Sequence, residues 1–82
     1  MKKERFVVTV TIRDGEHEYN VTHLCLVDVK GDMIQLDKFM RDFYDAKGSG
    51  EWKEIDNDYR LICVHSYKEV SDEEYEILKK FL

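Results

Sequence analysis

The fold is decided by the stretch FVVTVTIRDG, residues 6–15. Phe6, Val8, Val10 and Ile12 alternate with Val7, Thr9, Thr11 and Arg13, which is the period of a half-buried β-strand. The Asp-Gly pair that ends the stretch favours a two-residue hairpin turn with positive φ. Pairing through that turn sets Phe6 opposite His23. We therefore predict a second strand from about Glu16 to Val29, with His23 and Cys25 on the core side.

The rest of the chain predicts a helix, two further strands and a second helix. Gly31-Asp32 matches a helix start with a capping box, and we expect this amphipathic helix to end at Gly48. A weak strand follows at residues 51–55, and a firmer one at residues 59–67 is rich in β-branched and aromatic residues. Ser71 then begins the last helix with a second capping box.

This order of strand, strand, helix, strand, strand, helix places the protein in the α+β class. With 82 residues, the chain is interpreted as a single domain, residues 1–82, near the lower size limit for a self-supporting core. We expect an antiparallel or mixed sheet with two helices packed on one face, because each helix carries an apolar stripe that must be buried. The expected stripe of the second helix is Tyr75, Leu78, Phe81 and Leu82.

Composition indicates the cellular compartment of the protein and the chemistry of its partners. No segment resembles a signal peptide or approaches the ~20 apolar residues of a membrane span, and two cysteines without an export signal indicate reduced thiols in the cytoplasm. The net charge is −5, and acids predominate after residue 13. Since nucleic-acid binding depends on Lys and Arg contacts with phosphates, we expect no direct nucleic-acid binding. A basic surface on a protein partner would be attracted instead, although modest negative charge also serves solubility.

The only metal-ligand pattern is a mirrored pair of motifs, HLC at residues 23–25 and CVH at residues 63–65. Side chains two apart on a strand share a face, so paired strands would bring two thiols and two imidazoles together. Flat pairs of this kind do not wrap an ion, however, and free cysteine is among the most buried residue types. We therefore predict core residues without a cofactor, on neighbouring strands that bear Cys25 and Cys63. The alternative is a small zinc-binding domain using His23, Cys25, Cys63 and His65.

Trp52 is the candidate anchor for a protein partner. It follows a flexible glycine-rich tract, and it is either a buried lid residue or an exposed aromatic anchor with an acidic rim. The predicted partner-binding residues are Glu51, Trp52, Glu54, Asp56, Asp58 and Tyr59. We discern no arrangement of nucleophile, base and oxyanion donors, so we do not expect an enzyme.

These observations favour a small acidic protein-binding domain. We expect an inhibitor or adaptor, of the phage or mobile-element anti-defence type, that occupies a basic, nucleic-acid-binding surface of a larger protein. Charge complementarity and small size are the physical reasons. A different class of function stays open, a self-associating structural module that forms a homodimer by strand pairing, with the first strand offering its edge.

Overall fold

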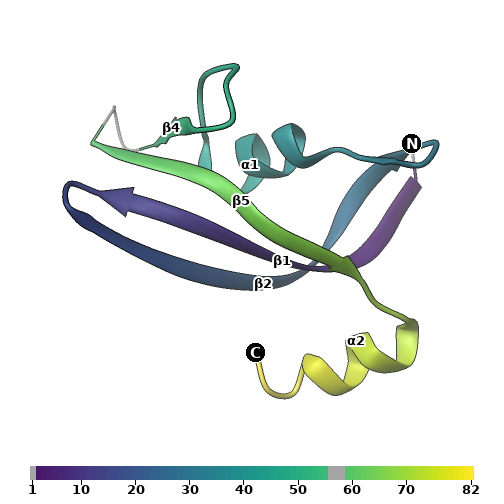
Figure 1. Ribbon diagram of the computed structural model, residues 1–82. Helices are drawn as coiled ribbons and strands as arrows, with labels where there is room; N and C mark the ends of the chain where they lie inside the picture. The colour runs from purple at the N-terminus through teal and green to yellow at the C-terminus, as the bar shows by residue number, and fades with distance from the viewer. Residues whose placement is uncertain (1, 56–58) are drawn as a thin grey trace.

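The computed structural model describes residues 2–55 and 59–82, which form a five-stranded antiparallel sheet and two helices (Figure 1). The elements are β1 Lys2–Asp14, β2 His17–Lys30, β3 Met33–Ile34, α1 Leu36–Tyr44, β4 Lys53–Ile55, β5 Arg60–Glu69 and α2 Asp72–Leu78. The strand order across the sheet is β3-β2-β1-β5-β4, so β1 lies at its centre. The predicted α+β class and the order of the main elements are confirmed, with the two-residue β3 as an addition.

The β1–β2 hairpin differs from the predicted register by two residues. Its turn is Gly15-Glu16, and Phe6 pairs with Cys25 instead of His23. Gly15 has a φ of 63°, which is the positive value required at the first central position of a type II′ turn. Since a shift of two residues preserves the faces of a strand, His23 and Cys25 still lie on the core side, as predicted.

Helix α1 begins later and ends earlier than the sequence predicts. Gly31-Asp32 forms a second hairpin turn, between β2 and β3, instead of a helix cap. The helix begins after Gln35, which makes no side-chain capping bond. At the other end Asp45 adopts the left-handed conformation, with a φ of 53°, and the Ala46 N–H donates to the Met40 carbonyl at 3.3 Å. The Asp45 N–H donates to the Arg41 carbonyl at 3.0 Å, which is the bond of the αL motif, and this motif closes the helix before the predicted glycine.

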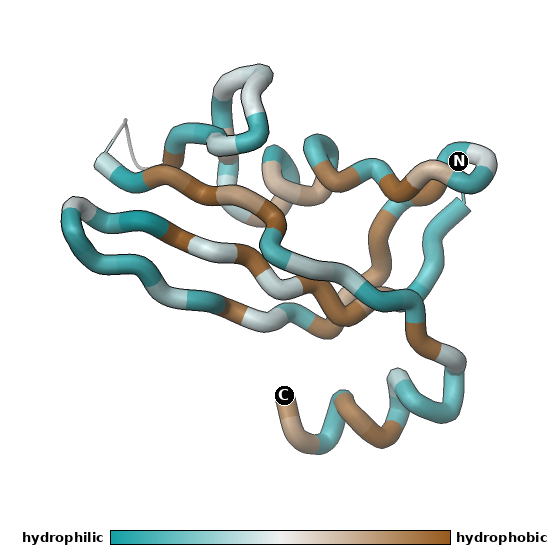
Figure 2. The backbone as a smooth tube through the Cα atoms, in the orientation of Figure 1, coloured by the Kyte–Doolittle hydropathy of each residue, from teal (hydrophilic) through white to brown (hydrophobic). Residues whose placement is uncertain are grey.

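The hydrophobic core lies between α1 and one face of the sheet (Figures 1 and 2). Its buried residues are Phe6, Val8, Val10, Ile12, Cys25, Val27, Val29, Phe39, Met40, Ala46, Ile55 and Ile62. The nine residues of α1 span about 14 Å, whereas the thirteen residues of β1 span about 43 Å. The helix therefore covers only part of this face.

Helix α2 has the predicted start but not the expected packing. The Ser71 hydroxyl accepts a hydrogen bond from the Glu74 N–H, and the Glu74 carboxylate accepts one from the Ser71 N–H. However, α2 lies on the opposite side of the sheet from α1 (Figure 1). It is held there by Arg5, whose guanidinium lies 2.7 Å from the Asp72 carboxylate and 5.7 Å from the centre of the Tyr75 ring.

The expected buried stripe on α2 is wrong. None of the α2 residues, all of which the structure describes, is buried, and Phe81 and Leu82 are 79% and 65% exposed. The Val70 N–H is still bonded to the Arg5 carbonyl, and the helix begins directly afterwards. Because Arg5 points away from the core face, the connection is too short to bring the helix round to α1. Within the described residues, no helix combines the length and the apolarity that a membrane crossing requires.

Candidate functional site

The mirrored histidine–cysteine motifs do not form one site. Cys25 pairs with Phe6 and lies on the α1 side of the sheet, whereas Cys63 pairs with Thr11 and lies on the other face. The predicted contact between their strands is wrong, because β1 separates β2 from β5. His65 is exposed beside the register shift in β5. Among the described residues, no three His, Cys, Asp or Glu side chains are placed to hold a metal ion.

Burial makes both thiols poor nucleophiles. Desolvation raises the pKa of Cys25 to about 11, and it also raises the pKa of Cys63. The His23 Nε2 is hydrogen-bonded to the Tyr44 hydroxyl, and its ring packs edge-on against Phe39, with centroids 6.0 Å apart. Burial lowers the pKa of His23. Cys25 and His23 contribute to the packing beneath α1, and neither they nor Cys63 on the other face assemble a nucleophile with a base.

The residues predicted to bind a partner are only partly assembled by the fold. Trp52 is half-buried, and the Arg13 guanidinium lies 4.4 Å from the centre of its ring. One face of the Trp52 ring is therefore covered by a cation. Glu51 and Glu54 are exposed, and Tyr59 is 81% exposed. The remaining two predicted residues, Asp56 and Asp58, lie outside the described residues.

Lys53 is a buried cation that the sequence pattern did not single out. It pairs with Ile62 on the core face of the sheet and is only 2% exposed. Its Nζ donates to the carbonyl oxygens of Gly48 at 3.3 Å and Gly50 at 3.0 Å, and it lies 3.3 Å from the Asp37 carboxylate. The ammonium thus ties the loop before β4 to the first turn of α1.

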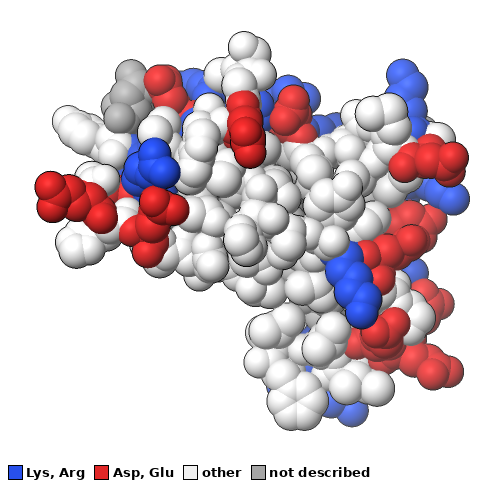
Figure 3. All heavy atoms as spheres, in the orientation of Figure 1, with Lys and Arg blue, Asp and Glu red and all other residues white. Residues whose placement is uncertain are grey.

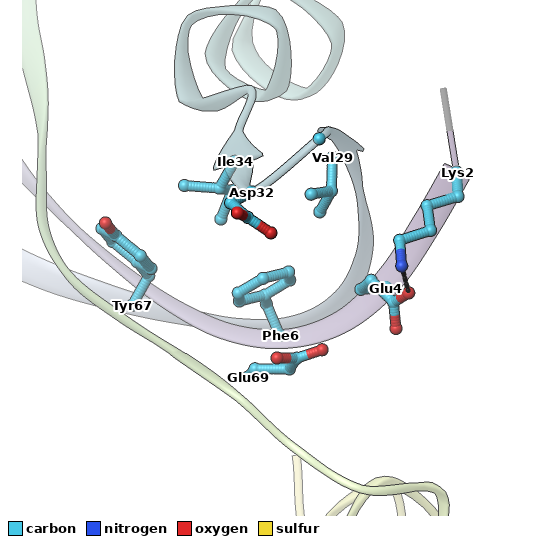
Figure 4. A pocket seen from close by; sticks show the side chains of 9 residues that line it. Lys2, Glu4, Phe6, Val29, Asp32, Ile34, Tyr67 and Glu69 are labelled. Carbon is cyan, nitrogen blue, oxygen red and sulfur yellow. Dashed lines mark ion pairs between the residues drawn. The ribbon is translucent and has the colours of Figure 1, made fainter.

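A pocket of about 360 Å³ opens on the part of the core face that α1 leaves uncovered (Figure 4). The Phe6 ring forms its floor, and Tyr67 packs edge-on beside it, with centroids 6.2 Å apart and an interplanar angle of 62°. Val29 from β2 and Ile34 from β3 complete the apolar lining. Two aromatic and two aliphatic side chains therefore form the apolar part of the pocket.

Three carboxylates surround this apolar part (Figure 4). Glu4 and Glu69 come from the neighbouring strands β1 and β5, and Asp32 comes from the β2–β3 turn. The Lys2 ammonium lies 3.4 Å from the Glu4 carboxylate. The rim of the pocket thus already accommodates an ammonium group, supplied by the chain itself.

A second hollow continues the acidic surface toward α2. It is lined by Glu4, Arg5, Glu69, Val70, Ser71, Asp72 and Glu73, so it shares Glu4 and Glu69 with the pocket. Figure 3 shows acidic side chains at this end of the molecule, with Lys and Arg side chains among them. Together the two hollows carry five carboxylates against the cations Lys2 and Arg5, each of which is already ion-paired. The lining of the two hollows therefore has an excess of carboxylates over cations.

Sequence reasoning missed this site, although one signal was present. Glu4 lies two residues before Phe6, so alternation places its carboxylate on the core face of the sheet. Because a carboxylate is rarely buried, this position indicates that no helix covers the core face beside Glu4. The position of Tyr67 carries no such signal, because it depends on the pairing of β5 with β1.

Comparison with known proteins found no matching family model, no matching curated protein and no matching solved structure.

Proposed function

We propose that this protein is a non-enzymatic binding domain that seats a lysine or arginine side chain of a larger protein in the pocket lined by Phe6 and Tyr67. The observation that carries this proposal is the combination of two aromatic side chains with a rim of three carboxylates. Aromatic rings attract cations, and carboxylates accept strong charge-assisted hydrogen bonds from ammonium and guanidinium groups.

The pocket is accessible to an incoming cation. Tyr67 is 51% exposed, so a partner side chain can reach its ring. The Lys2 side chain, which now pairs with Glu4, is 71% exposed. Because an exposed ion pair contributes only about 0–1 kcal/mol, a better-placed cation from a partner can displace it.

An apolar hollow beside the pocket extends the proposed contact. Its volume is about 450 Å³, and it shares Tyr67 with the pocket. Leu36, Met40 and Val64 are among its lining residues. A partner segment would place a cationic residue in the pocket and the apolar residue that follows it in the apolar hollow. Such anchor residues contribute most of the binding energy in protein interfaces.

More specifically, we propose that the protein is a cytoplasmic inhibitor or adaptor, of the phage or mobile-element anti-defence type, that occupies a nucleic-acid-binding surface. Such surfaces present Lys and Arg side chains that neutralise phosphates, and the acidic end of this molecule would attract them. Both cysteines are free thiols, which agrees with a reducing compartment. The acidic and aromatic residues around Trp52 stay a predicted second contact with the same partner.

Calorimetric titration with a synthetic peptide of alternating arginine and leucine tests the pocket. The matched ligand replaces arginine by citrulline, which keeps the shape and removes the charge. We expect the arginine peptide alone to bind, with an affinity that falls as salt is added. The double variant Glu4→Gln, Glu69→Gln should weaken binding at least tenfold, since it removes two charge-assisted contacts. The control Glu16→Gln, Glu76→Gln removes the same net charge elsewhere and should weaken it less than twofold.

Equal losses in the two double variants would show general charge attraction in place of a pocket, and salt-independent binding would contradict the electrostatic mechanism. Affinity capture from the native host, with the Glu4→Gln, Glu69→Gln variant as control, tests whether the protein is such an inhibitor. We expect a captured protein that binds DNA and releases it when this chain is added. A specific partner that keeps its DNA would refute the inhibitor.

A further inference from the structure

The outer edge of β2 is unpaired over most of its length. β3 pairs with β2 only at Val29 and Lys30, and the Gln35 N–H donates to the Asp28 carbonyl at 2.9 Å. In the part of the chain that the structure describes, no strand pairs with the outer edge of residues 17–27. The central strand β1 is paired on both sides from Phe6 to Asp14, so the longer open edge belongs to β2 and not to the first strand, which is the strand that the sequence favours for dimer formation.

The hairpin determines which backbone groups of β2 point outward. Asp14 and His17 flank the two-residue turn and form its closing hydrogen-bonded pair, so odd-numbered residues of β2 bond to β1. Even-numbered residues therefore direct their N–H and C=O groups away from β1, as the bond at the Asp28 carbonyl confirms. The outward-directed residues of the open segment are Glu18, Asn20, Thr22, Leu24 and Leu26.

This edge lacks the sequence and structural features by which proteins commonly prevent edge-to-edge strand pairing. Residues 17–27 contain no Lys, Arg or Pro, and the pairing of β2 with β1 runs without a bulge. The open edge of β5, by contrast, lies beside a register shift. Large apolar side chains also flank the β2 edge: Tyr19, Leu26 and Phe43 are 42%, 46% and 50% exposed.

We propose that β2 pairs antiparallel with β2 of a second copy, about a two-fold axis at Thr22. This register sets Asn20 opposite Leu24 and Glu18 opposite Leu26 of the other copy, so all five outward-directed residues of each copy find partners. An axis at any other residue leaves some of them unpaired, because the hairpin turn bounds the open segment at one end and the Asp28–Gln35 bond bounds it at the other.

The charges at the two ends of β2 favour the same arrangement. The turn end carries Asp14, Glu16 and Glu18 against Arg13 and Arg60 and has a net negative charge. At the other end Lys3, Lys30 and Lys38 balance Asp28, Asp32 and Asp42. Antiparallel pairing keeps the two acidic turn ends apart and places each beside the balanced, lysine-bearing end of the other copy, and complementarity of this kind sets partner choice and register.

Sedimentation velocity over a wide range of concentrations tests the dimer. We expect the wild-type chain to associate reversibly from monomer to dimer. Thr22→Lys places two like charges opposite each other at the axis and should weaken association at least tenfold, whereas Thr22→Val keeps the edge and should change it less than threefold. A chain that stays monomeric at the highest concentration overturns the proposal, even if the edge then accepts a foreign strand. Unchanged association of a folded Thr22→Lys variant overturns the register.

Cross-linking gives a readout that does not depend on a charge at the edge. Paired Cα atoms of antiparallel strands lie about 5.5 Å apart at hydrogen-bonded positions, which is within disulfide reach. Oxidation of the Thr22→Cys variant should therefore yield a covalent dimer. The control Thr9→Cys, on the same face of the central strand, should stay monomeric. Equal cross-linking of both variants, or a non-covalent dimer without cross-linking at Thr22→Cys, would contradict the axis.

Discussion

Replacement of Lys53 tests how a charged side chain stabilises the core of so small a domain. Its stem lies on the core face of the sheet, and its ammonium donates to the carbonyl oxygens of Gly48 and Gly50. Lys53→Met keeps most of the apolar stem and removes the donors. Lys53→Ala removes the donors and the stem together, so the two variants separate the two contributions.

The structure sets the size of each effect. Hydrogen bonds from a charged group contribute about 1.5–3 kcal/mol each, but the two glycines are exposed and water can replace the ammonium at their carbonyls. We therefore expect Lys53→Met to lower the free energy of unfolding by about 1–2 kcal/mol in total. Lys53→Ala also removes three methylene groups, at about 0.8 kcal/mol each, and leaves a cavity, so its loss should reach about 4 kcal/mol.

Urea unfolding measures both variants, with far-UV circular dichroism as the global probe. Trp52 is the only tryptophan of the chain, so its fluorescence reports on the segment next to Lys53. The N–H groups of Lys47 and Glu54 each donate to the other residue's carbonyl at 2.8 Å, and both should exchange hydrogen faster in Lys53→Met. Equal losses in the two variants would refute the role of the buried stem. Losses below about 0.5 kcal/mol in both, the level of an ordinary surface change, would refute the burial itself.

Three further predictions concern single residues. Arg13→Ala should shift the emission of Trp52 to longer wavelength and lower stability by about 0.5–1 kcal/mol through loss of the cation–π contact; an unchanged spectrum would contradict that contact. Asp45→Gly should raise the free energy of unfolding by about 0.5–1 kcal/mol, because glycine adopts positive φ without strain. A melting temperature below that of the wild type would contradict this prediction. Burial lowers the pKa of His23 below its ordinary value of 6.5, so its contribution to stability is present above that value and is lost as pH falls through the lowered pKa. Wild-type protein should therefore lose stability on mild acidification more steeply than His23→Phe, and parallel pH curves would rule this out.

The faces of the hairpin were predictable, whereas the neighbours of its strands were not. Alternation assigns Phe6 and Cys25 to the core face even when the register is wrong by two residues, because an even shift preserves faces. Nothing local in the sequence indicates that β5 pairs with β1 instead of β2. Cys63 was for this reason placed beside Cys25, although the two thiols lie on opposite faces of the sheet.

Long-range pairing also explains the misplaced helix start and the missed pocket. Asp32 with Gln35 matches a capping box, but the pairing of Val29 with Ile34 turns the chain into a hairpin there, and the sheet overrides the local helix preference. The pocket depends in the same way on Tyr67 reaching the side of Phe6 through the β1–β5 pairing. Glu4 alone carried a local signal of the open surface.

The central position of β1 also sets the order in which this protein folds. The β1–β2 hairpin closes through a two-residue turn and needs only local contacts, which form within microseconds. The other edge of β1 must wait for β5, since Asp14 pairs with Arg60 and Phe6 with Glu69, and closing so large a loop costs entropy before any contact offsets it. During synthesis the β1–β2 hairpin leaves the ribosome well before β5 does. Docking of β5 is thus the expected slow step, and substitutions in β5 that strengthen its early contacts with β1 should speed folding.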